Sequence, residues 1–276
     1  MLLLAPKRYI IKHKGSEFMK ITSLVENISE KENIGAEHGL SLFIETENHN
    51  ILFDMGQTDL FSENAEKLSV DLSSVDIAVL SHGHYDHGGG LFKFLSLNGK
   101  AKVYINKNAF GDYYNGTEKY IGLDKSLMGN PRFVMTDDLY EIEKGLSLYS
   151  CNDKKKKYDL GSFGLKKKEG ENFLPDDFIH EHYLLIEENN KKILISGCSH
   201  KGILNIAEWF SPDVLIGGFH FSKLPLDEKL REYAEILSSY ETTFYTCHCT
   251  GEEQYKFMKK YMDNLFYLSS GESVEI

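Results

Sequence analysis

The chain carries a dense cluster of metal-ligand side chains at residues 81–87, which read Ser-His-Gly-His-Tyr-Asp-His. Imidazole nitrogens and carboxylate oxygens are the atoms with which proteins bind zinc, manganese and iron. His82 and His84 are two residues apart, so in an extended segment their rings point to the same side. Asp86 and His87 follow, and the glycines that come next allow the chain to turn. The spacing predicts one metal ion at the first pair and a second ion at the last pair.

An apolar run at residues 77–80 comes directly before this cluster and predicts a buried strand. The same order recurs along the chain, with apolar runs that end at Cys198 and His200, at His220, and at His248 between two cysteines. Loops at strand ends commonly place ligands on a rigid frame. We therefore expect His200 and His248 to join the site, whereas the pattern leaves His220 open between a ligand and a structural residue.

The rest of the chain alternates between short strand-like runs and helical ones, which suits two similar sheets packed face to face. Residues 111–177 differ, with glycines, aromatics and lysine runs at 154–157 and 166–168, and are expected to form an insertion or lid over the site, with strand content near 133–149. Strands are expected at 41–44, 50–53, 75–80, 101–105, 183–186, 192–196, 213–216, 243–246 and 265–268. Helices are expected at 59–68, 91–97, 203–210, 226–237 and 252–261.

The two lysine runs have two interpretations. They are either solvated loop faces or a positively charged part of the lid that captures an anionic substrate such as a phosphate ester. A local positive patch on an acidic protein would raise the association rate of an anion in a salt-dependent way.

The composition is that of an ordinary globular protein, with 276 residues, 41% hydrophobic and 26% charged. A net charge of −11 disfavours a nucleic-acid partner, and no apolar run is long enough to span a membrane. Four cysteines are too few for a disulfide framework in this length, which favours a reducing, cytoplasmic location. Residues 1–18 are expected to be an N-terminal extension, and 19–276 a single domain that opens with a strand at Met19.

The segment from His82 to His87 resembles the HxHxDH signature of the metallo-β-lactamase superfamily, and Asp54 matches the aspartate that supports the metal loop there. The resemblance implies an α/β fold, a four-layer αββα sandwich with an insertion or lid, and a site along one edge of the two sheets. Further segments resemble the subgroup named after dihydropterin ribofuranosyl-aminobenzene phosphate synthase; these are residues 37–41, 196–200, 217–220 and 248–251.

Carried over position by position, the resemblance implies two divalent metal ions, with zinc preferred and manganese or iron also compatible. The ligands implied for the first ion are His82 and His84. The ligands implied for the second ion are Asp86, His87 and His248.

The resemblance also assigns roles to residues outside the motif. Cys198 occupies the position of the aspartate that bridges the two ions in many relatives. A histidine that many relatives place before that position is represented here by His180 or His182, or is replaced by His200, which we favour as the ligand that completes the first ion. Asp54 is expected to fix a ligand histidine through its other ring nitrogen.

The implied mechanism is hydrolytic. A divalent ion lowers the pKa of bound water from about 15.7 toward roughly 7, so that two ions together supply hydroxide and polarise a carbonyl or phosphoryl oxygen. Asp86 is the expected catalytic residue, because its carboxylate can orient the nucleophile and accept its proton. His38 and His220 are expected to bind substrate.

The sequence therefore predicts a metal-dependent hydrolase, or a related transferase or lyase, that acts on a small, anionic, phosphorylated or pterin-like metabolite. The alternatives are a nuclease of the same fold, which the acidic composition disfavours, and a non-catalytic sensor of a metal or ligand. A di-iron redox role is disfavoured because those relatives usually have glutamate where this chain has His84.

Overall fold

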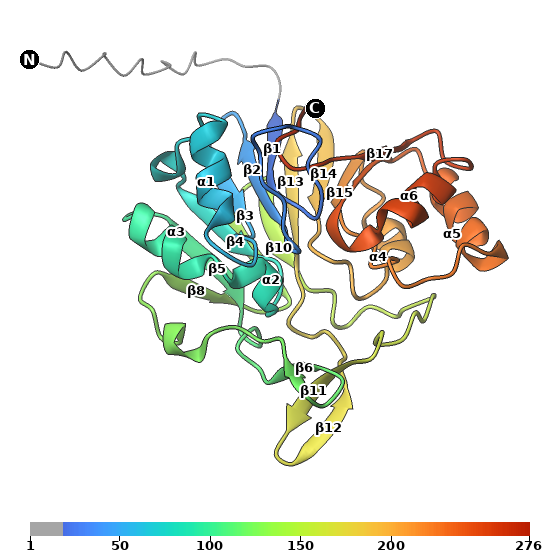
Figure 1. Cartoon of the computed structure of the whole chain (residues 1–276), viewed down its shortest axis with the longest axis horizontal. Helices are drawn as coiled ribbons and strands as arrows, with labels where there is room; N and C mark the ends of the chain where they lie inside the picture. Colours follow the sequence, from blue (N-terminus) through green and yellow to red (C-terminus); the bar gives the residue numbers. More distant parts are fainter. Residues whose placement is uncertain (1–18) are drawn as a thin grey trace, which may run out of the picture.

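The computed structural model describes residues 19–276, and the predicted N-terminal extension 1–18 lies outside them. Two seven-stranded sheets pack face to face, and helices cover both outer faces (Figure 1). This arrangement is the four-layer αββα sandwich that the sequence predicts.

The first sheet has the order β18-β1-β2-β3-β4-β5-β8, and its strands from β3 to β8 run parallel. Helices α1 (Leu60–Lys67) and α3 (Leu91–Leu97) cover its outer face. The strands are β1 Lys20–Val25, β2 Ser41–Glu45, β3 Asn50–Phe53, β4 Ile77–Leu80, β5 Lys102–Asn106, β8 Phe133–Thr136 and β18 Ser273–Glu275.

The second sheet has the order β17-β16-β15-β14-β13-β10-β9, and its strands from β14 to β17 run parallel. Its outer face is covered by α4 (Ile203–Phe210), α5 (Glu228–Ser238) and α6 (Glu252–Met258). The strands are β9 Leu139–Glu143, β10 Leu146–Tyr149, β13 Tyr183–Glu188, β14 Lys191–Ile195, β15 Val214–Gly217, β16 Thr243–Thr246 and β17 Leu265–Tyr267.

The main core lies between the two sheets, where alternate residues of each strand face inward. Ile21 and Leu42 from the first sheet belong to the same buried cluster as Leu184, Ile195 and Ile216 from the second. Burial of aliphatic side chains like these is the main favourable term in folding. The core therefore fixes the two sheets against each other and sets the positions of their strand ends.

Residues 111–177 are divided in the structure, which corrects the extent of the expected insertion. Strand β8 pairs with β5 in the first sheet, while β10 pairs with β13 in the second and β9 adds to its edge. Strand β10 also buries Leu146 and Leu148, so residues 133–149 belong to the sandwich itself. Four other strands form a separate sheet, here called the small sheet: β6 Tyr113–Asn115, β7 Lys119–Tyr120, β11 Leu165–Glu169 and β12 Asn172–Pro175.

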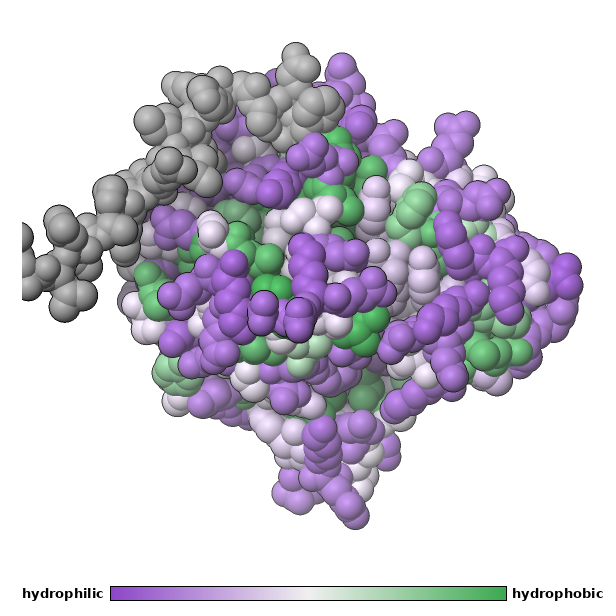
Figure 2. Space-filling view, turned by 45° about the horizontal axis from the view of Figure 1, so that its top comes forward, coloured by the Kyte–Doolittle hydropathy of each residue, from purple (hydrophilic) through white to green (hydrophobic). Residues whose placement is uncertain are grey.

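The small sheet projects from one edge of the sandwich, at the bottom of Figure 1. Short helical turns complete the fold: η1 Leu72–Ser74, α2 Tyr85–Gly88, η2 Lys125–Leu127 and η3 His248–Thr250. None of the helices described between residues 19 and 276 is long and apolar enough to cross a membrane. The face drawn in Figure 2 carries mostly hydrophilic residues, with hydrophobic ones scattered among them.

Candidate metal centre

Asp54 anchors the segment of residues 81–87, here called the metal loop, which follows β4. The carboxylate of Asp54 is fully buried; it accepts hydrogen bonds from Ser81 N and Ser81 Oγ, both at 2.7 Å, and lies 2.7 Å from His87 Nδ1. Ser81 Oγ donates its proton to Asp54, so it acts as acceptor for His82 Nδ1 at 2.8 Å. Asp54 therefore fixes His87 directly and His82 through Ser81, as the sequence leads us to expect for one ligand histidine.

Two further histidines are held in the same way from other strand ends. His200 follows β14, and its Nδ1 lies 3.2 Å from Glu181 Oε1. His248 follows β16, and its Nδ1 lies 2.8 Å from Asn27 Oδ1. In each ring the outer nitrogen faces an acceptor, so the opposite nitrogen is free to face the centre.

The inner nitrogens gather around the thiol of Cys198, which follows β14. His82 and His200 form one set of donors with Cys198, and His87 and His248 form another, with all donor atoms of a set within 4.8 Å of one another. His87 Nε2 lies 3.2 Å from Cys198 Sγ and also 3.2 Å from His248 Nε2. Cys198 thus belongs to both sets, which is the placement expected of a bridging ligand.

The donor chemistry of these sets fits a metal ion. His82 Nε2 is buried and has no hydrogen-bond partner among residues 19–276. The outer nitrogens of His87 and His248 both face acceptors, so with both rings neutral two lone pairs would meet at the 3.2 Å contact between their Nε2 atoms. A cation between them removes this repulsion and satisfies the nitrogens.

The electrostatics of the rings also favour a cation. Burial lowers the pKa of His82 and His84 well below the ordinary value, and neighbouring imidazoles lower it further, so both rings are neutral bases. Burial also lowers the pKa of His87, but the charges of Asp54 and Asp86 outweigh it and raise the pKa to about 9. In the absence of a metal ion, a proton on His87 therefore supplies the positive charge that the surrounding carboxylates favour at this place.

Asp86 lies on the open side of the second set. Its Oδ2 atom is 3.5 Å from His248 Nε2, 3.7 Å from His87 Nε2 and 3.2 Å from His38 Nε2. Burial raises the pKa of Asp86, but the charge of His87 and the hydrogen bonds from His248 and His38 hold it well below its usual value. The side chain of His38 is 55% exposed, so His38 marks the solvent side of the centre.

His84 is next to His82, with ring centroids 4.5 Å apart, but its donor atom groups with His180, one of the alternatives for the first ion, and with Asp176, which sequence reasoning did not assign. His84 Nε2 is buried and lies 4.0 Å from Asp176 Oδ2, beyond hydrogen-bond distance. His180 Nε2 lies 3.2 Å from the same oxygen, and His180 Nδ1 accepts the N–H of Gly83 at 3.0 Å.

Gly83 has no room for a side chain, since an added Cβ would lie 2.1 Å from the carbonyl oxygen of Ala109. The glycine between the first two histidines of the motif is therefore required for packing.

His182, one of the alternatives for completing the first ion, does not face the centre. Its Nε2 donates to the carbonyl of Leu80 at 2.7 Å, and its Nδ1 accepts from Thr136 Oγ1 at 3.1 Å. Burial lowers its pKa to about 4, so the ring is neutral. Of the alternatives, the structure brings His200 into a donor set with His82, while His180 binds the metal loop through Gly83.

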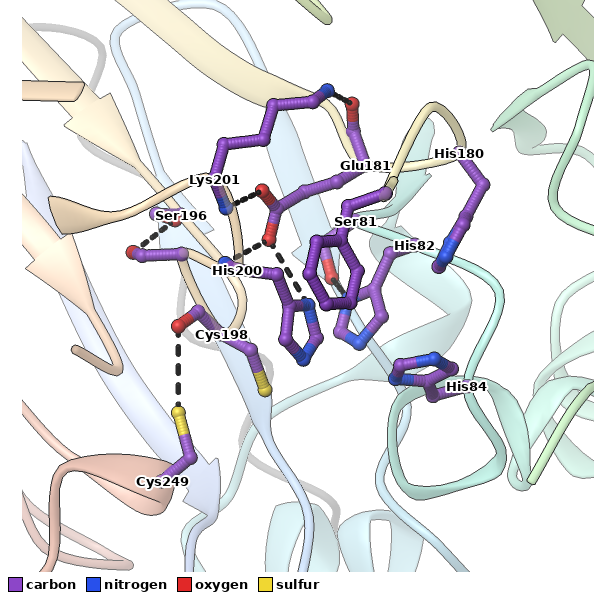
Figure 3. Close-up of polar contacts among 12 residues, drawn as sticks. Ser81, His82, His84, His180, Glu181, Ser196, Cys198, His200, Lys201 and Cys249 are labelled. Atoms are coloured by element: carbon purple, nitrogen blue, oxygen red, sulfur yellow. Dashed lines mark hydrogen bonds and ion pairs between the residues drawn. The ribbon is translucent and has the colours of Figure 1, made fainter. Parts of the chain in front are cut away.

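Glu181 organises the backbone that presents His200, a role the sequence did not reveal. Its carboxylate accepts the N–H groups of His200 at 2.7 Å and Lys201 at 3.1 Å (Figure 3). It also accepts the hydroxyl of Tyr183 at 2.7 Å. Burial raises its pKa, but the hydrogen bond and charge of His200 lower it further, so Glu181 is ionised. Lys201 is buried beside it and donates to the carbonyls of Ser150 and Glu181, and burial lowers its pKa to about 8.

His220 follows β15, and its ring nitrogen lies near the thiols of Cys198 and Cys249. It has a left-handed backbone with φ of 56°, and its ring centroid is 4.5 Å from that of His200 and 4.4 Å from that of Phe163. The two histidines expected to contact substrate therefore occupy different positions, His38 at the solvent side and His220 beside the thiol.

The lysine runs are partly neutralised by carboxylates. Lys157 Nζ lies 3.1 Å from Glu208, and Lys167 Nζ lies 2.8 Å from both Glu169 and Asp177. A different lysine, Lys119 on β7, contacts the metal loop by donating to the hydroxyl of Tyr85 at 3.0 Å.

The profile of the metallo-beta-lactamase superfamily matches residues 34–238, so the chain belongs to this superfamily. It is 33% identical over 241 residues to an uncharacterized protein of Methanocaldococcus jannaschii, covering 84% of this chain and 90% of that protein. It is 25% identical over 268 residues to the 7,8-dihydropterin-6-methyl-4-(β-D-ribofuranosyl)-aminobenzene-5′-phosphate synthase of the same organism, covering 87% and 90%.

Solved structures agree with the fold. A crystal structure described as a metal-dependent hydrolase of the beta-lactamase superfamily matches with a TM-score of 0.80 and 30% identity, over 94% of this chain and 99% of that one. The metallo-beta-lactamase fold protein YhfI of Bacillus subtilis matches with a TM-score of 0.59 and 13% identity, over 94% and 100%. The superfamily and the fold predicted from the sequence are confirmed.

Proposed function

We propose that the chain is a metal-dependent hydrolase that uses two divalent ions, with zinc as the preferred metal. The observation that carries the proposal is the pair of donor sets that share Cys198, one with His82 and His200 and the other with His87 and His248. In this proposal His84 adds to the first set and Asp86 to the second. Histidine and thiolate ligands suit zinc, while manganese and iron are less favoured by the thiolate.

Bound ions would lower the pKa of water and withdraw electron density from a carbonyl or phosphoryl oxygen of the substrate. Asp86 is ionised and lies at the open side, so its Oδ2 atom is placed to accept the proton of the nucleophile. His38 Nε2, 3.2 Å from that oxygen and exposed to solvent, can carry the proton away. Asp54 and Glu181 hold ligand histidines in orientation throughout.

The proposed substrate is a small phosphorylated or pterin-like metabolite. Support comes from the name of the synthase to which the chain is 25% identical. Further support comes from Lys119 on β7, whose positive charge lies against the metal loop at Tyr85. The ring of Phe163 is partly exposed, lies with its centroid 4.4 Å from that of His220, and offers an apolar face for a flat heterocycle.

The test is turnover by metal-free protein reconstituted with zinc or manganese, assayed on phosphate monoesters, phosphodiesters, pterin phosphates and single-stranded RNA and DNA. We expect hydrolysis of a small ester, and we expect Asp86→Asn to lower kcat by about 10²–10⁴-fold. Asp71→Asn, at an exposed helix cap, is the matched control. A wild-type protein that binds metal but never exceeds Asp86→Asn on any substrate would overturn the proposal in favour of a sensor, and turnover of nucleic acid alone would favour a nuclease.

A further inference from the structure

A second group of soft ligands lies beside the two donor sets. Cys198, His220 and Cys249 each offer one donor atom, and the three atoms lie within 4.8 Å of one another. They follow β14, β15 and β16, so three neighbouring parallel strands of the second sheet deliver them to one place. Neither His220 nor Cys249 belongs to the donor sets of the proposed function.

The two residues that join Cys198 in this group, His220 and Cys249, have few other polar partners among the described residues. His220 Nδ1 is buried and finds no hydrogen-bond partner in the described part of the chain. The thiol of Cys249 donates a long hydrogen bond, 3.5 Å, to the carbonyl oxygen of Cys198 (Figure 3). A buried imidazole nitrogen without a partner costs free energy unless a ligand satisfies it.

The backbone makes room for the Cys249 thiol. A Cβ at Gly218 would lie 2.4 Å from Cys249 Sγ, so a side chain at that position would displace the sulfur. Cys247, two residues earlier, behaves differently, because it is buried in the apolar core between the two sheets. Of the two cysteines that flank His248, only Cys249 is directed at the centre.

We propose that Cys198, His220 and Cys249 form a separate binding site for one thiophilic d10 cation, such as Cd²⁺ or Cu⁺. This group offers two thiolates and one imidazole, whereas each donor set of the proposed function has one thiolate. The group is therefore the softer ligand set, and soft donors select such cations. The proposal goes beyond the hydrolase function, because that function assigns no role to Cys249 and no cation to His220.

Sharing Cys198 has a consequence for the whole centre. A cation held by both thiolates withdraws Cys198 from its position between the two donor sets. Such a cation therefore competes with the ions of the proposed hydrolase and does not add to them.

The test is a titration of metal-free, reduced, full-length protein with Cd²⁺, followed by the sulfur-to-cadmium charge-transfer absorbance, which scales with the number of thiolates bound. For the first equivalent we expect the amplitude of two thiolates in the wild type and about half of it in Cys249→Ser. Cys247→Ser, the matched control, should keep the full amplitude. Equal amplitudes in the wild type and Cys249→Ser would overturn the proposal.

Two further variants keep the test decisive if Cys249→Ser fails to fold. His220→Gln removes the nitrogen ligand, so we expect weaker cadmium binding with an unchanged amplitude at saturation. Gly218→Ala displaces the Cys249 sulfur, so we expect the one-thiolate amplitude. Unchanged binding in both variants would contradict the site. The absorbance does not depend on turnover, so failure of this proposal and failure of the hydrolase function are distinguishable.

Discussion

Each histidine in the two donor sets has a polar partner at its outer ring nitrogen. A serine hydroxyl holds one, an amide oxygen holds another, and carboxylates hold the remaining two; the pairs are His82 with Ser81, His248 with Asn27, His87 with Asp54 and His200 with Glu181. An outer acceptor fixes both the tautomer and the orientation of a ligand imidazole. The arrangement of these partners is therefore as informative about metal binding as the ligands themselves.

His84 lacks such a contact at hydrogen-bond distance, and Asp176 is the carboxylate placed to supply it. We expect Asp176→Asn to weaken metal binding by about 10–100-fold, the usual effect of losing an outer partner. Asp177→Asn is the matched control, because the neighbouring Asp177 pairs with Lys167 on the surface. Competition with a chelator measures the affinity of both variants. Equal losses in both would show that Asp176 does not act through His84.

His182 predicts a pH dependence of stability that is independent of the metal. Its pKa is about 4 in the folded chain against an ordinary histidine pKa of about 6.5, so the unfolded chain binds the proton more strongly. The free energy of unfolding should therefore rise with pH between about 4 and 6.5, by up to about 1.4 kcal/mol per pH unit. His182→Gln can keep both hydrogen bonds, and it should remove this contribution.

The measurement is urea unfolding of metal-free protein at several pH values, with the wild type and His182→Gln compared at each. The plots of unfolding free energy against pH should become parallel for the two proteins above about pH 6.5, where His182 is neutral in both the folded and the unfolded chain. A difference between the two proteins that stays constant from pH 4 to 6.5 would contradict the prediction.

Among the elements, the small sheet is connected to the centre through aromatic rings. Phe178, just after β12, stacks on His200 with ring centroids 4.5 Å apart and an angle of 9°. Tyr113 on β6 lies 3.9 Å from His180, and both aromatic residues belong to one buried cluster with Ile121 and Leu165. The small sheet thus supports histidines that the two main sheets deliver.

We expect Phe178→Leu to lower metal affinity several-fold while the chain stays folded, because leucine keeps apolar volume but loses the flat contact with His200. Phe173→Leu, on the half-buried β12 hairpin, should leave the affinity unchanged. Isothermal titration with zinc measures both. If Phe178→Leu binds zinc as the wild type does, the small sheet does not support the centre.

On the scale of the whole molecule, the centre joins the two halves of the chain. Asp54 and the metal loop come from the first sheet, whereas Cys198, His200 and His248 come from the second. A bound ion would therefore tie the two sheets together across the core and stabilise the folded state.

Metal binding should raise the melting temperature of the entire chain in one transition. At a free zinc concentration of 100 Kd the gain is about 2.7 kcal/mol, which corresponds to a Tm increase of about 5–10 °C for a chain of this size. Calorimetry with and without a chelator measures the shift, and His87→Ala should reduce it. A shift confined to one of two separate transitions would show that the ion does not join the halves.

Much of the fold could be predicted from local patterns. The strand at residues 50–53 and the helix at 203–210 lie where the sequence places them, because apolar spacing reports burial directly. Strand β18 was not predicted, and 133–149 was assigned to a lid, because these short edge strands gain their structure from pairing with distant partners. Sequence reasoning also missed Asp176 and the role of Glu181, whose contacts come from folding the chain back on itself.

The sequence by itself determined the superfamily, the sandwich and the metal loop, since these follow from local spacing and from the type of side chain. Only the tertiary structure decided which histidines share a space with Cys198, because that depends on how two sheets pack through a common core. It also separated His200, which joins a donor set, from His182, which bonds to the backbone of Leu80. The reason is physical: a histidine can bind a metal only when the fold leaves one of its ring nitrogens without another partner, and an acceptor at the other nitrogen then fixes the ring.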